Sequence, residues 1–329
     1  MGRRFAALAA AALALVLAPA AAASGPPLRV PQAELEKGLK CPIGPLAHTK
    51  KTPVMFVTGT GVSGDTAWLL VADAFAALGH PTCYVNFPAN TTADIQVSVE
   101  YLVHGLRRQY ELAGRKIAVI GISQGGLLPR FALTYWPDLR RKVGDFVAVA
   151  GTQHGTNLFS CSAAAPCEPA AWQQVAGSNL LRALNSQPDE TPGRVSYTTV
   201  RSLTDETVQP QTGKRPTSSL RGARNIAIQD ICPGRATTHV GAIVDSVTFA
   251  AFYDAIARPG KGKAGAADTS AFPPDVCSHP YGPGLNDLKT SLFLGVADVV
   301  VDAPISLGPS STALPAEPPV RKVFKRKRR

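Results

Sequence analysis

The stretch from Lys116 to Thr134, KIAVIGISQGGLLPRFALT, constrains the fold of this chain more than any other. It begins with an apolar run typical of a buried parallel strand, and apolar residues at helical spacing follow soon after. Between them, Gly121 to Gly125 fits the pattern G-x-S-x-G. A strand, a tight turn and a helix in this order predict a nucleophile elbow, in which the Ser123 hydroxyl projects into solvent. The alternative is a glycine-rich turn whose serine only caps the helix.

Further apolar runs alternate with helical patterns along the chain. Strands are predicted at Val54 to Val57, Thr82 to Phe87, Phe146 to Ala150, Val195 to Arg201 and Asn225 to Ile231. Helices are predicted at Thr66 to Leu78, Ile95 to Leu112 and Ala170 to Leu184. This alternation indicates an α/β fold with a mostly parallel central sheet flanked by helices. We expect one large domain over residues 24–305, since a chain of 329 residues can form a single α/β domain with insertions.

Residues 155–193 are rich in small residues and prolines and follow the strand predicted at 146–150. Long segments between a strand and the next core element commonly lie over the strand ends and carry function. We therefore expect this segment to form a cap or lid insertion.

Two polar residues after the later strands complete a candidate triad with Ser123. Asp205 follows the strand ending at Arg201, and His239 follows the last strand. The order serine, aspartate, histidine is that of α/β hydrolases. His239 would accept the Ser123 proton, while Asp205 would fix the imidazole tautomer. The alternatives are a turn-forming aspartate and a loop histidine without a role. His154 precedes any acidic partner, so we expect it to be a pocket or structural residue.

The loop after the first predicted core strand allows two interpretations. Gly59 to Gly64 fits G-x-G-x-x-G, as a dinucleotide-binding loop would. However, the next strand ends in Asn86 and Phe87, where an acidic residue should hold the ribose. The other use of such a loop is an oxyanion hole, with backbone N–H donors from Thr60 and Gln124. A hydroxyl-stabilised turn at Thr60 remains the simpler alternative.

The N-terminus and the cysteines both indicate export. Residues 1–23 have two arginines, then an apolar run, then small residues, which is the layout of a secretory signal peptide; we expect no transmembrane segment in the mature chain. Six cysteines in an exported chain predict disulfides, with 15 pairings possible. None lies in a C-x-x-C arrangement, which argues against a cysteine-ligated zinc or a thioredoxin-type site.

The formal charge of +11 is concentrated at the two ends of the chain. Seven basic residues lie between Arg321 and Arg329 and two more in the leader, which leaves +2 on the rest. A nearly neutral body argues against a nucleic-acid-binding surface. We expect residues 306–329 to form a disordered, solvent-exposed basic tail that is dispensable for chemistry and makes transient contact with anionic surfaces.

Five motifs resemble the lipase family of Candida antarctica lipase B, over roughly Pro53 to Cys277. They are VTGTG at Val57 to Gly61, DIQVSVEYLV at Asp94 to Val103, SQGGL at Ser123 to Leu127, AWQQVAGS at Ala171 to Ser178, and TDETVQPQ at Thr204 to Gln211. The resemblance implies an α/β-hydrolase fold and hydrolysis of carboxylic esters, including triacylglycerols, without a metal or organic cofactor. It also implies Ser123, Asp205 and His239 as the triad, with Thr60 and Gln124 as the oxyanion hole.

The resemblance further implies disulfides Cys41–Cys83 and Cys232–Cys277, which leaves Cys161 to pair with its near neighbour Cys167. The family's yeast member has a tryptophan just before its nucleophile, where this chain has Ile122. We therefore expect a roomier alcohol side of the pocket, and assign to that pocket Ile122, Thr152, His154 and Thr207.

Taken with the leader, the resemblance predicts a secreted, monomeric bacterial ester hydrolase acting on a lipid or a small ester. A different class remains open, since a cell-envelope binding protein could keep a hydrolase scaffold without catalysis.

Overall fold

The computed structural model describes residues 24–258, 262–285, 287–302 and 310–325, so the predicted signal peptide lies outside the described residues. Within these ranges, seven strands form one sheet in the order β1-β3-β2-β4-β5-β6-β7. Only β1 is antiparallel to its neighbour, and every other pair is parallel. The strands are β1 Leu39–Ile43, β2 Val54–Val57, β3 Thr82–Val85, β4 Ile117–Ile122, β5 Val143–Val149, β6 Ser196–Arg201 and β7 Arg224–Ala227.

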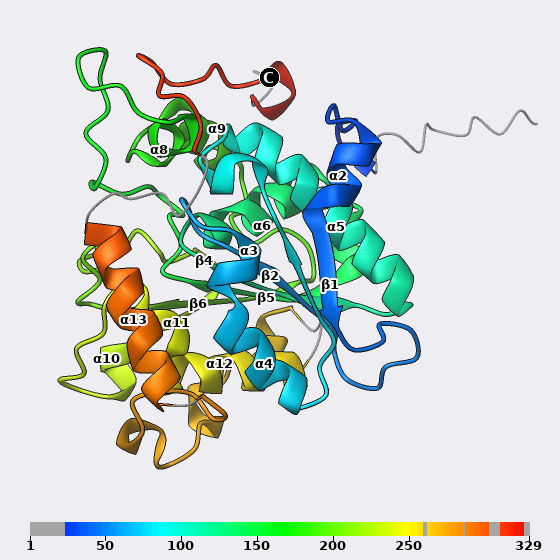
Figure 1. Cartoon of the computed structure of the whole chain (residues 1–329), viewed down its shortest axis with the longest axis vertical. Helices are drawn as coiled ribbons and strands as arrows, with labels where there is room; N and C mark the ends of the chain where they lie inside the picture. The colour runs from blue at the N-terminus through cyan, green and yellow to red at the C-terminus, as the bar shows by residue number, and fades with distance from the viewer. Residues whose placement is uncertain (1–23, 259–261, 286, 303–309, 326–329) are drawn as a thin grey trace, which may run out of the picture.

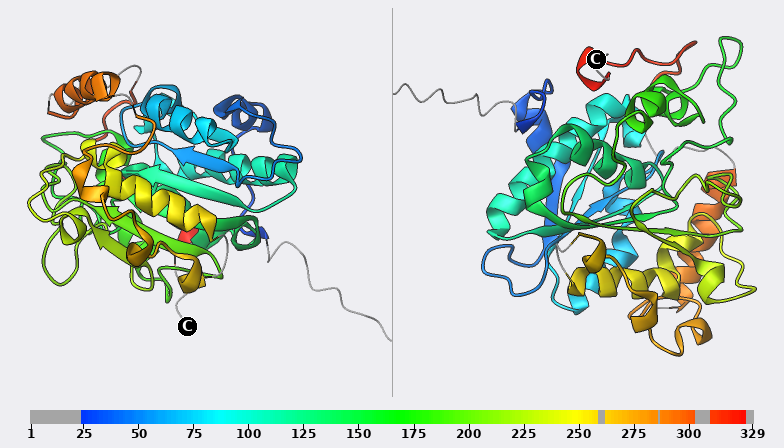
Figure 2. Two further views of the ribbon diagram at one scale, coloured as in Figure 1. Left: turned by 90° about the horizontal axis from the view of Figure 1, so that it is seen from below. Right: turned by 180° about the vertical axis from the view of Figure 1, so that it is seen from behind.

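Helices cover both faces of this sheet (Figures 1 and 2). The α-helices described are α2 Gln32–Gly38, α3 Gly64–Ala67, α4 Leu69–Ala77, α5 Ile95–Ala113, α6 Gln124–Tyr135, α7 Leu139–Lys142, α8 Pro169–Gln174, α9 Asn179–Asn185, α10 Ile228–Ile231, α11 Gly241–Val244, α12 Ser246–Ala257 and α13 Asp287–Asp302. Short 3-10 turns lie at Pro88–Thr91, Gly262–Gly265, Thr269–Ala271, Val276–Ser278 and Lys322–Phe324.

The side-chain alternation of the strands creates two apolar cores. In β2, Met55 and Val57 face the layer that contains α5 and α6, while Val54 and Phe56 face the layer that contains α4 and α12. All four side chains are fully buried. Burial on both faces explains why the parallel strands are continuous apolar runs rather than alternating ones, and each such side chain contributes about 1.5–3 kcal/mol.

The parallel register brings the carboxyl ends of the central strands to one edge. Val57 of β2 pairs with Gly121 of β4, and Ile122 pairs with Val149 of β5. Ligands in open α/β sheets bind beyond this edge. The loops after β2, β4, β5 and β6 therefore bring their polar residues toward one place.

Three predicted elements differ from those observed by more than a shift of one or two residues at an end. The helix expected over Thr66 to Leu78 is interrupted at Trp68, between α3 and α4. The helix expected over 170–184 is divided into α8 and α9, because Gly177 adopts a positive φ of 78° and the Ser178 side chain caps α9 by accepting from Leu181 N–H. The strand expected to reach Ile231 ends at Ala227, where α10 begins. In these last two cases apolar residues recur on both sides of the change in backbone direction, so their spacing does not reveal it.

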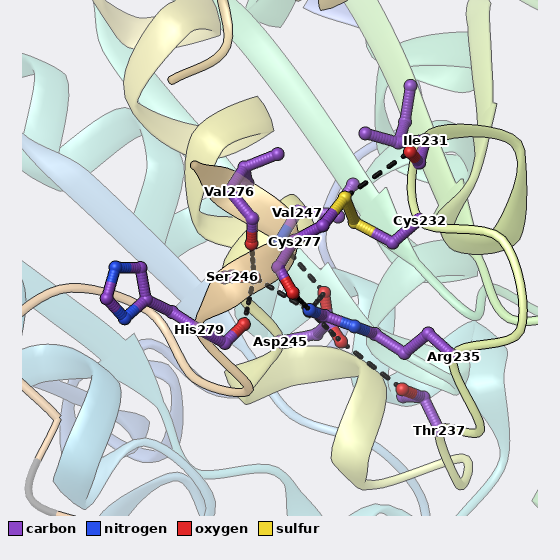
Figure 3. The surroundings of a disulfide bond; sticks show 10 residues. All are labelled: Ile231, Cys232, Arg235, Thr237, Asp245, Ser246, Val247, Val276, Cys277 and His279. Atoms are coloured by element: carbon purple, nitrogen blue, oxygen red, sulfur yellow. Dashed lines mark hydrogen bonds and ion pairs between the residues drawn. A yellow bond between two sulfur atoms is a disulfide. The ribbon is translucent and has the colours of Figure 1, made fainter. Parts of the chain in front are cut away.

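Three disulfides are present, and they are the same pairs as expected from the sequence. Cys41–Cys83 joins edge strand β1 to β3, and Cys161–Cys167 closes a short loop in the 155–193 insertion. Cys232–Cys277 fastens the segment before His239 to the chain that follows α12 (Figure 3). None of the described helices is long and apolar enough to span a bilayer.

The expectation of a disordered, exposed tail over 306–329 is wrong for residues 310–325. Phe324 is 1% exposed, Val320 is also buried, and Arg321 forms an ion pair with the buried Glu100. Composition suggested solvation because the segment is basic, but an aromatic residue within it reaches the core. Figure 1 shows this segment, in red, running over α8 and α9. Residues 326–329 lie outside the described ranges.

Candidate active site

Ser123 lies between β4 and α6 with φ 57° and ψ −126°. A positive φ is strained for a residue with a side chain and is common at functional turns. The flanking glycines make the turn possible. A Cβ atom on Gly121 would overlap the carbonyl oxygen of Gly125, and a Cβ atom on Gly125 would overlap the carbonyl oxygen of Val57. The glycine spacing of the motif therefore has the steric cause expected for a nucleophile elbow.

Asp205 and His239 form a buried pair on the loops after β6 and β7. His239 Nδ1 lies 2.9 Å from Asp205 Oδ2, and the two residues are 4% and 1% exposed. The other carboxylate oxygen, Oδ1, accepts from the backbone N–H groups of Thr207 at 2.9 Å and Val208 at 2.7 Å. Because both carboxylate oxygens are engaged, Asp205 holds the imidazole ring in one orientation and favours the Nδ1–H tautomer.

The pKa of His239 reflects opposing influences. Burial disfavours the imidazolium, but the charge and hydrogen bond of Asp205, with a smaller contribution from Glu206, outweigh burial and raise the pKa above its usual value. Glu206 also accepts the backbone N–H of His239, at 3.0 and 3.2 Å. The pair is therefore arranged to accept a proton and stabilise the resulting charge. Ser123 Oγ has no hydrogen bond within the described part of the chain, and such contacts often tighten only when substrate binds.

The Thr60 loop lies directly against Ser123. A Cβ atom on Gly59 would be 3.1 Å from Ser123 Cβ. Thr60 Oγ1 donates to Gln124 Oε1 at 2.6 Å, which links this loop to the first residue of α6. Among the described residues, neither the Thr60 N–H nor the Gln124 N–H has a hydrogen-bond acceptor. Two free N–H groups beside a candidate nucleophile are suited to bind a developing negative charge.

Gln174, at the end of α8, is the residue that sequence reasoning missed. Its Nε2 donates to Thr60 Oγ1 at 2.9 Å and to Gln124 Oε1 at 3.1 Å. Its Oε1 accepts from Thr152 Oγ1 at 2.9 Å, so one buried amide connects three loops. Its position in the AWQQVAGS motif was the available signal, but a glutamine on a helix has no recognisable spacing to a nucleophile.

The remaining predicted pocket residues have different surroundings. The His154 ring is directed to the segment between β6 and β7, with Nε2 3.1 Å from the carbonyl oxygen of Ser219. Burial, and then the charge of Arg130, lower the pKa of His154. Thr207 supports Asp205 through its backbone, and Ile122 is 7% exposed and packs in the core on the α4 and α12 side. Of this set, the described hydrogen bonds join only Thr152 to the Thr60 and Gln124 network.

A cavity of about 420 Å³ lies beside the loop that carries His239. Arg235 crosses its wall and donates to Asp245, to Ser246 Oγ at 2.8 Å and to the carbonyl oxygen of Cys277 at 2.7 Å (Figure 3). Burial raises the pKa of Asp245, with hydrogen bonds from Val247 and Arg235 opposing it. The cavity does not reach Ser123, and its lining comprises Arg235, Ala236, Thr237, Thr238, Gly241, Asp245, Cys277, Ser278, Pro280, Tyr281 and Leu294.

In the described ranges, no three histidine, cysteine, aspartate or glutamate side chains are grouped so as to hold a metal ion.

The helix-flanked mixed sheet with its elbow after β4 defines the α/β-hydrolase fold. The model of the family "Lipase (class 2)" matches residues 51–240, so the chain belongs to this family. It is 33% identical to lipase B of Pseudozyma antarctica over 254 residues, which cover 74% of this chain and 72% of the relative.

Solved structures agree with this assignment. The crystal structure of Aspergillus fumigatus lipase B has a TM-score of 0.80 and 27% identity, and the match covers 98% of this chain and 77% of that chain. The mature lipase BlEst2 of Bacillus licheniformis, with a TM-score of 0.51 and 17% identity over 66% of this chain and 96% of its own, shares the fold alone. The family match and the lipase relatives support an ester hydrolase.

Proposed function

We propose that the protein is a serine ester hydrolase that forms an acyl-enzyme on Ser123. The observation that carries this proposal is the buried 2.9 Å hydrogen bond between His239 and Asp205 at the sheet edge where the Ser123 elbow lies. An oriented histidine whose charged form is stabilised is what a nucleophilic serine requires as its base.

The proposed reaction has two halves. His239 Nε2 removes the Ser123 proton as Oγ attacks the ester carbonyl, and Asp205 stabilises the imidazolium. The N–H groups of Thr60 and Gln124 bind the oxyanion of the tetrahedral intermediate. Collapse of this intermediate breaks the ester bond, and His239 protonates the departing alcohol. Water activated by His239 then releases the acid and restores Ser123.

The substrates we propose are carboxylic esters, including triacylglycerols, with no metal or organic cofactor. The names of the relatives, both of them lipases, support this class. We place the alcohol-side pocket near Ile122 and Thr152, and His154 and Thr207 farther along its wall. The 155–193 insertion would act as a cap, since it carries Gln174 to the Thr60 loop.

Labelling with a fluorophosphonate probe tests the proposal directly, because only an activated serine reacts. We expect the native protein to be labelled at Ser123 and the Ser123→Ala variant to remain unlabelled. A folded native protein that neither reacts with the probe nor hydrolyses p-nitrophenyl butyrate would instead support the non-catalytic binding protein.

We also propose that the protein is secreted and monomeric. Three disulfides support an oxidising compartment. Contact with anionic surfaces is proposed for Lys322 and Lys325, whose side chains are exposed. Binding of Lys322→Ala/Lys325→Ala to phosphatidylserine vesicles should be weaker than that of the native protein at low salt and equal to it at high salt.

A further inference from the structure

Residues 310–325, here called the C-terminal strap, lie along one face of α5. Ser311 N–H donates to Thr92 Oγ1 at 2.6 Å, before α5 begins. Gln96 holds the strap at two points, donating to the carbonyl oxygen of Pro319 at 3.2 Å and accepting from Arg321 N–H at 2.7 Å. One turn farther on, Glu100 pairs with the Arg321 guanidinium. Contacts every four residues on one helix face indicate a docked segment rather than a loose end.

The end of the strap is fixed by aromatic packing. The Phe324 ring lies 4.9 Å from that of Phe131 and 4.8 Å from that of Tyr135, measured between centroids. Tyr135 Oη also donates to the carbonyl oxygen of Phe324 at 2.7 Å. Aromatic pairs of this geometry stabilise beyond the area they bury.

The strap also holds the 155–193 insertion. Leu314 and Cys167 exchange backbone hydrogen bonds of 2.7 and 3.2 Å, and Trp172 Nε1 donates to the carbonyl oxygen of Leu314 at 2.8 Å. The Glu317 carboxylate accepts from the backbone N–H groups of Asn179 at 2.8 Å and Leu180 at 2.9 Å, where α9 begins. Both helices of the insertion are therefore tied to the end of the chain.

Three consecutive residues of α8 connect this attachment to the candidate active site. Trp172 binds the strap. Gln173 binds the start of α5, accepting from Ile95 N–H at 2.7 Å and donating to Asp94 Oδ1 at 2.7 Å. Gln174 binds Thr60 and Gln124. Because these three side chains belong to one short helix, movement at Trp172 displaces Gln174.

We infer that the C-terminal strap positions the oxyanion hole through α8, with Trp172 and Glu317 as positioning residues. Trp172 lies on α8 itself, whereas Glu317 fixes the start of α9, whose cap residue Ser178 donates from Oγ to the carbonyl oxygen of Gln173 at 2.8 Å. This inference rests on the proposed function and names a part of the chain that acts on that site from outside it. Oxyanion donors are effective only when they are fixed before reaction, and misplacement by about 1 Å can cost about 100-fold in rate. Loosening the strap should therefore lower turnover of a small ester while leaving its binding nearly unchanged.

The test is a double-mutant cycle with p-nitrophenyl butyrate. We expect Trp172→Phe, which removes the indole N–H donor but keeps an aromatic ring, to lower kcat about fivefold. Glu317→Ala should lower it about tenfold, with KM changed less than about twofold for both variants. Gln174→Ala should lower kcat about 30- to 100-fold. Val323→Ala is the matched control, since this strap side chain is 48% exposed and carries no hydrogen-bonding group.

The coupling of each strap substitution to Gln174→Ala distinguishes misplacement of the oxyanion hole from a general loss of protein stability. In the Gln174→Ala background, Trp172→Phe and Glu317→Ala should each reduce kcat by no more than about twofold, because the connection to Thr60 is already cut. Full additivity, or losses confined to KM or to thermal stability, would overturn the inference while the proposed function stands. If Glu317→Ala fails to fold, Trp172→Phe carries the same cycle. A native enzyme without esterase activity or probe labelling would refute the proposed function, and the strap inference with it.

Discussion

The two halves of the candidate active site meet at one sheet edge but are held by different forces. Ser123 is fixed by backbone contact, since the glycines on either side leave no room for a Cβ atom against β2 and α6. Asp205 and His239 stand on loops held by polar side chains. Ser202 Oγ donates to the carbonyl oxygen of Thr237 at 2.7 Å, and Gln229 Nε2 donates to Ser202 Oγ at 3.0 Å.

This difference predicts different responses to change. The backbone atoms around Gly121 and Gly125 are already in contact, so an added side-chain atom cannot be accommodated by a small shift. A substitution at either glycine should therefore displace Ser123. A polar loop network can lose or gain one partner and shift by small steps, which allows the basicity of His239 to vary while Ser123 stays in place. The serine half is expected to be rigid and the acid–base half adjustable.

The largest effect should come from removing the reacting groups. Ser123→Ala and His239→Ala should each lower kcat by about 10⁴- to 10⁶-fold, and the double variant should be little worse than either alone, because the residues act as one unit. Asp205→Asn should cost less, since it disturbs the imidazole tautomer without deleting a reacting group. Steady-state kinetics on p-nitrophenyl butyrate measures these losses.

His154→Ala provides the matched histidine control. Its ring is bonded to Ser219 rather than to Asp205, so we expect turnover within about tenfold of the native enzyme. The assignment is reversed if His154→Ala abolishes turnover and His239→Ala keeps it, with both variants folded by circular dichroism.

Gly125→Ala tests the steric half of the comparison. The added Cβ would overlap the carbonyl oxygen of Val57, so β2 and α6 must separate. We expect kcat to fall at least about 100-fold and unfolding free energy to drop by about 2–3 kcal/mol. Gly295→Ala on α13 is the control, because nothing lies within 4 Å of its added Cβ. It should leave kcat unchanged and raise the unfolding free energy by no more than about 1 kcal/mol through helix propensity. Equal effects of the two substitutions would contradict a steric elbow.

The elbow and the parallel sheet were predictable because their signals are local. A glycine two residues on either side of Ser123 and apolar runs of strand length depend on neighbouring sequence alone. The pairing of Asp205 with His239 was also expected, from chain order and from resemblance to a lipase family. Gln174 was not, because its role depends on three loops that meet only in the folded chain.

The C-terminal strap was predicted to be a disordered tail, and this prediction is wrong. Its composition is that of a solvated tail, and neither charge nor hydropathy distinguishes a docked strap from a free one. What docks it is Glu100, buried on α5, together with an aromatic cluster on α6 that receives Phe324. These partners are more than 180 residues away in sequence, so no local pattern could indicate them.

A smaller effect is expected from Ile122→Trp, on the elbow side. Ile122 is 7% exposed, so an indole must either enter the proposed alcohol pocket or crowd the core. We expect the preference for small over bulky secondary-alcohol esters to rise about three- to tenfold, with unfolding free energy lowered by about 1–3 kcal/mol. Ile122→Leu, of equal volume, should change neither. Competition between butyrate esters of a small and a bulky secondary alcohol measures the preference, and an unchanged ratio would remove Ile122 from the pocket.

The smallest effect, Glu206→Gln, probes the adjustable half. Glu206 is among the groups that raise the pKa of His239, and glutamine keeps an acceptor for the His239 N–H while removing the charge. The pKa of His239 should fall, and the effect is weak because the exposed Glu206 carboxylate acts through solvent. Since His239 must be neutral to accept the serine proton, the acid limb of kcat/KM should move to lower pH, with the plateau at higher pH unchanged.

The raised pKa of His239 also affects stability. It stabilises the folded state below the usual histidine pKa of about 6.5, and this contribution is lost as the pH rises through the pKa of the folded state. Glu206→Gln should therefore lower stability mainly at acid pH. A limb that moves upward, or a plateau that falls with an unmoved limb, would show that Glu206 acts on loop geometry rather than on the charge of His239.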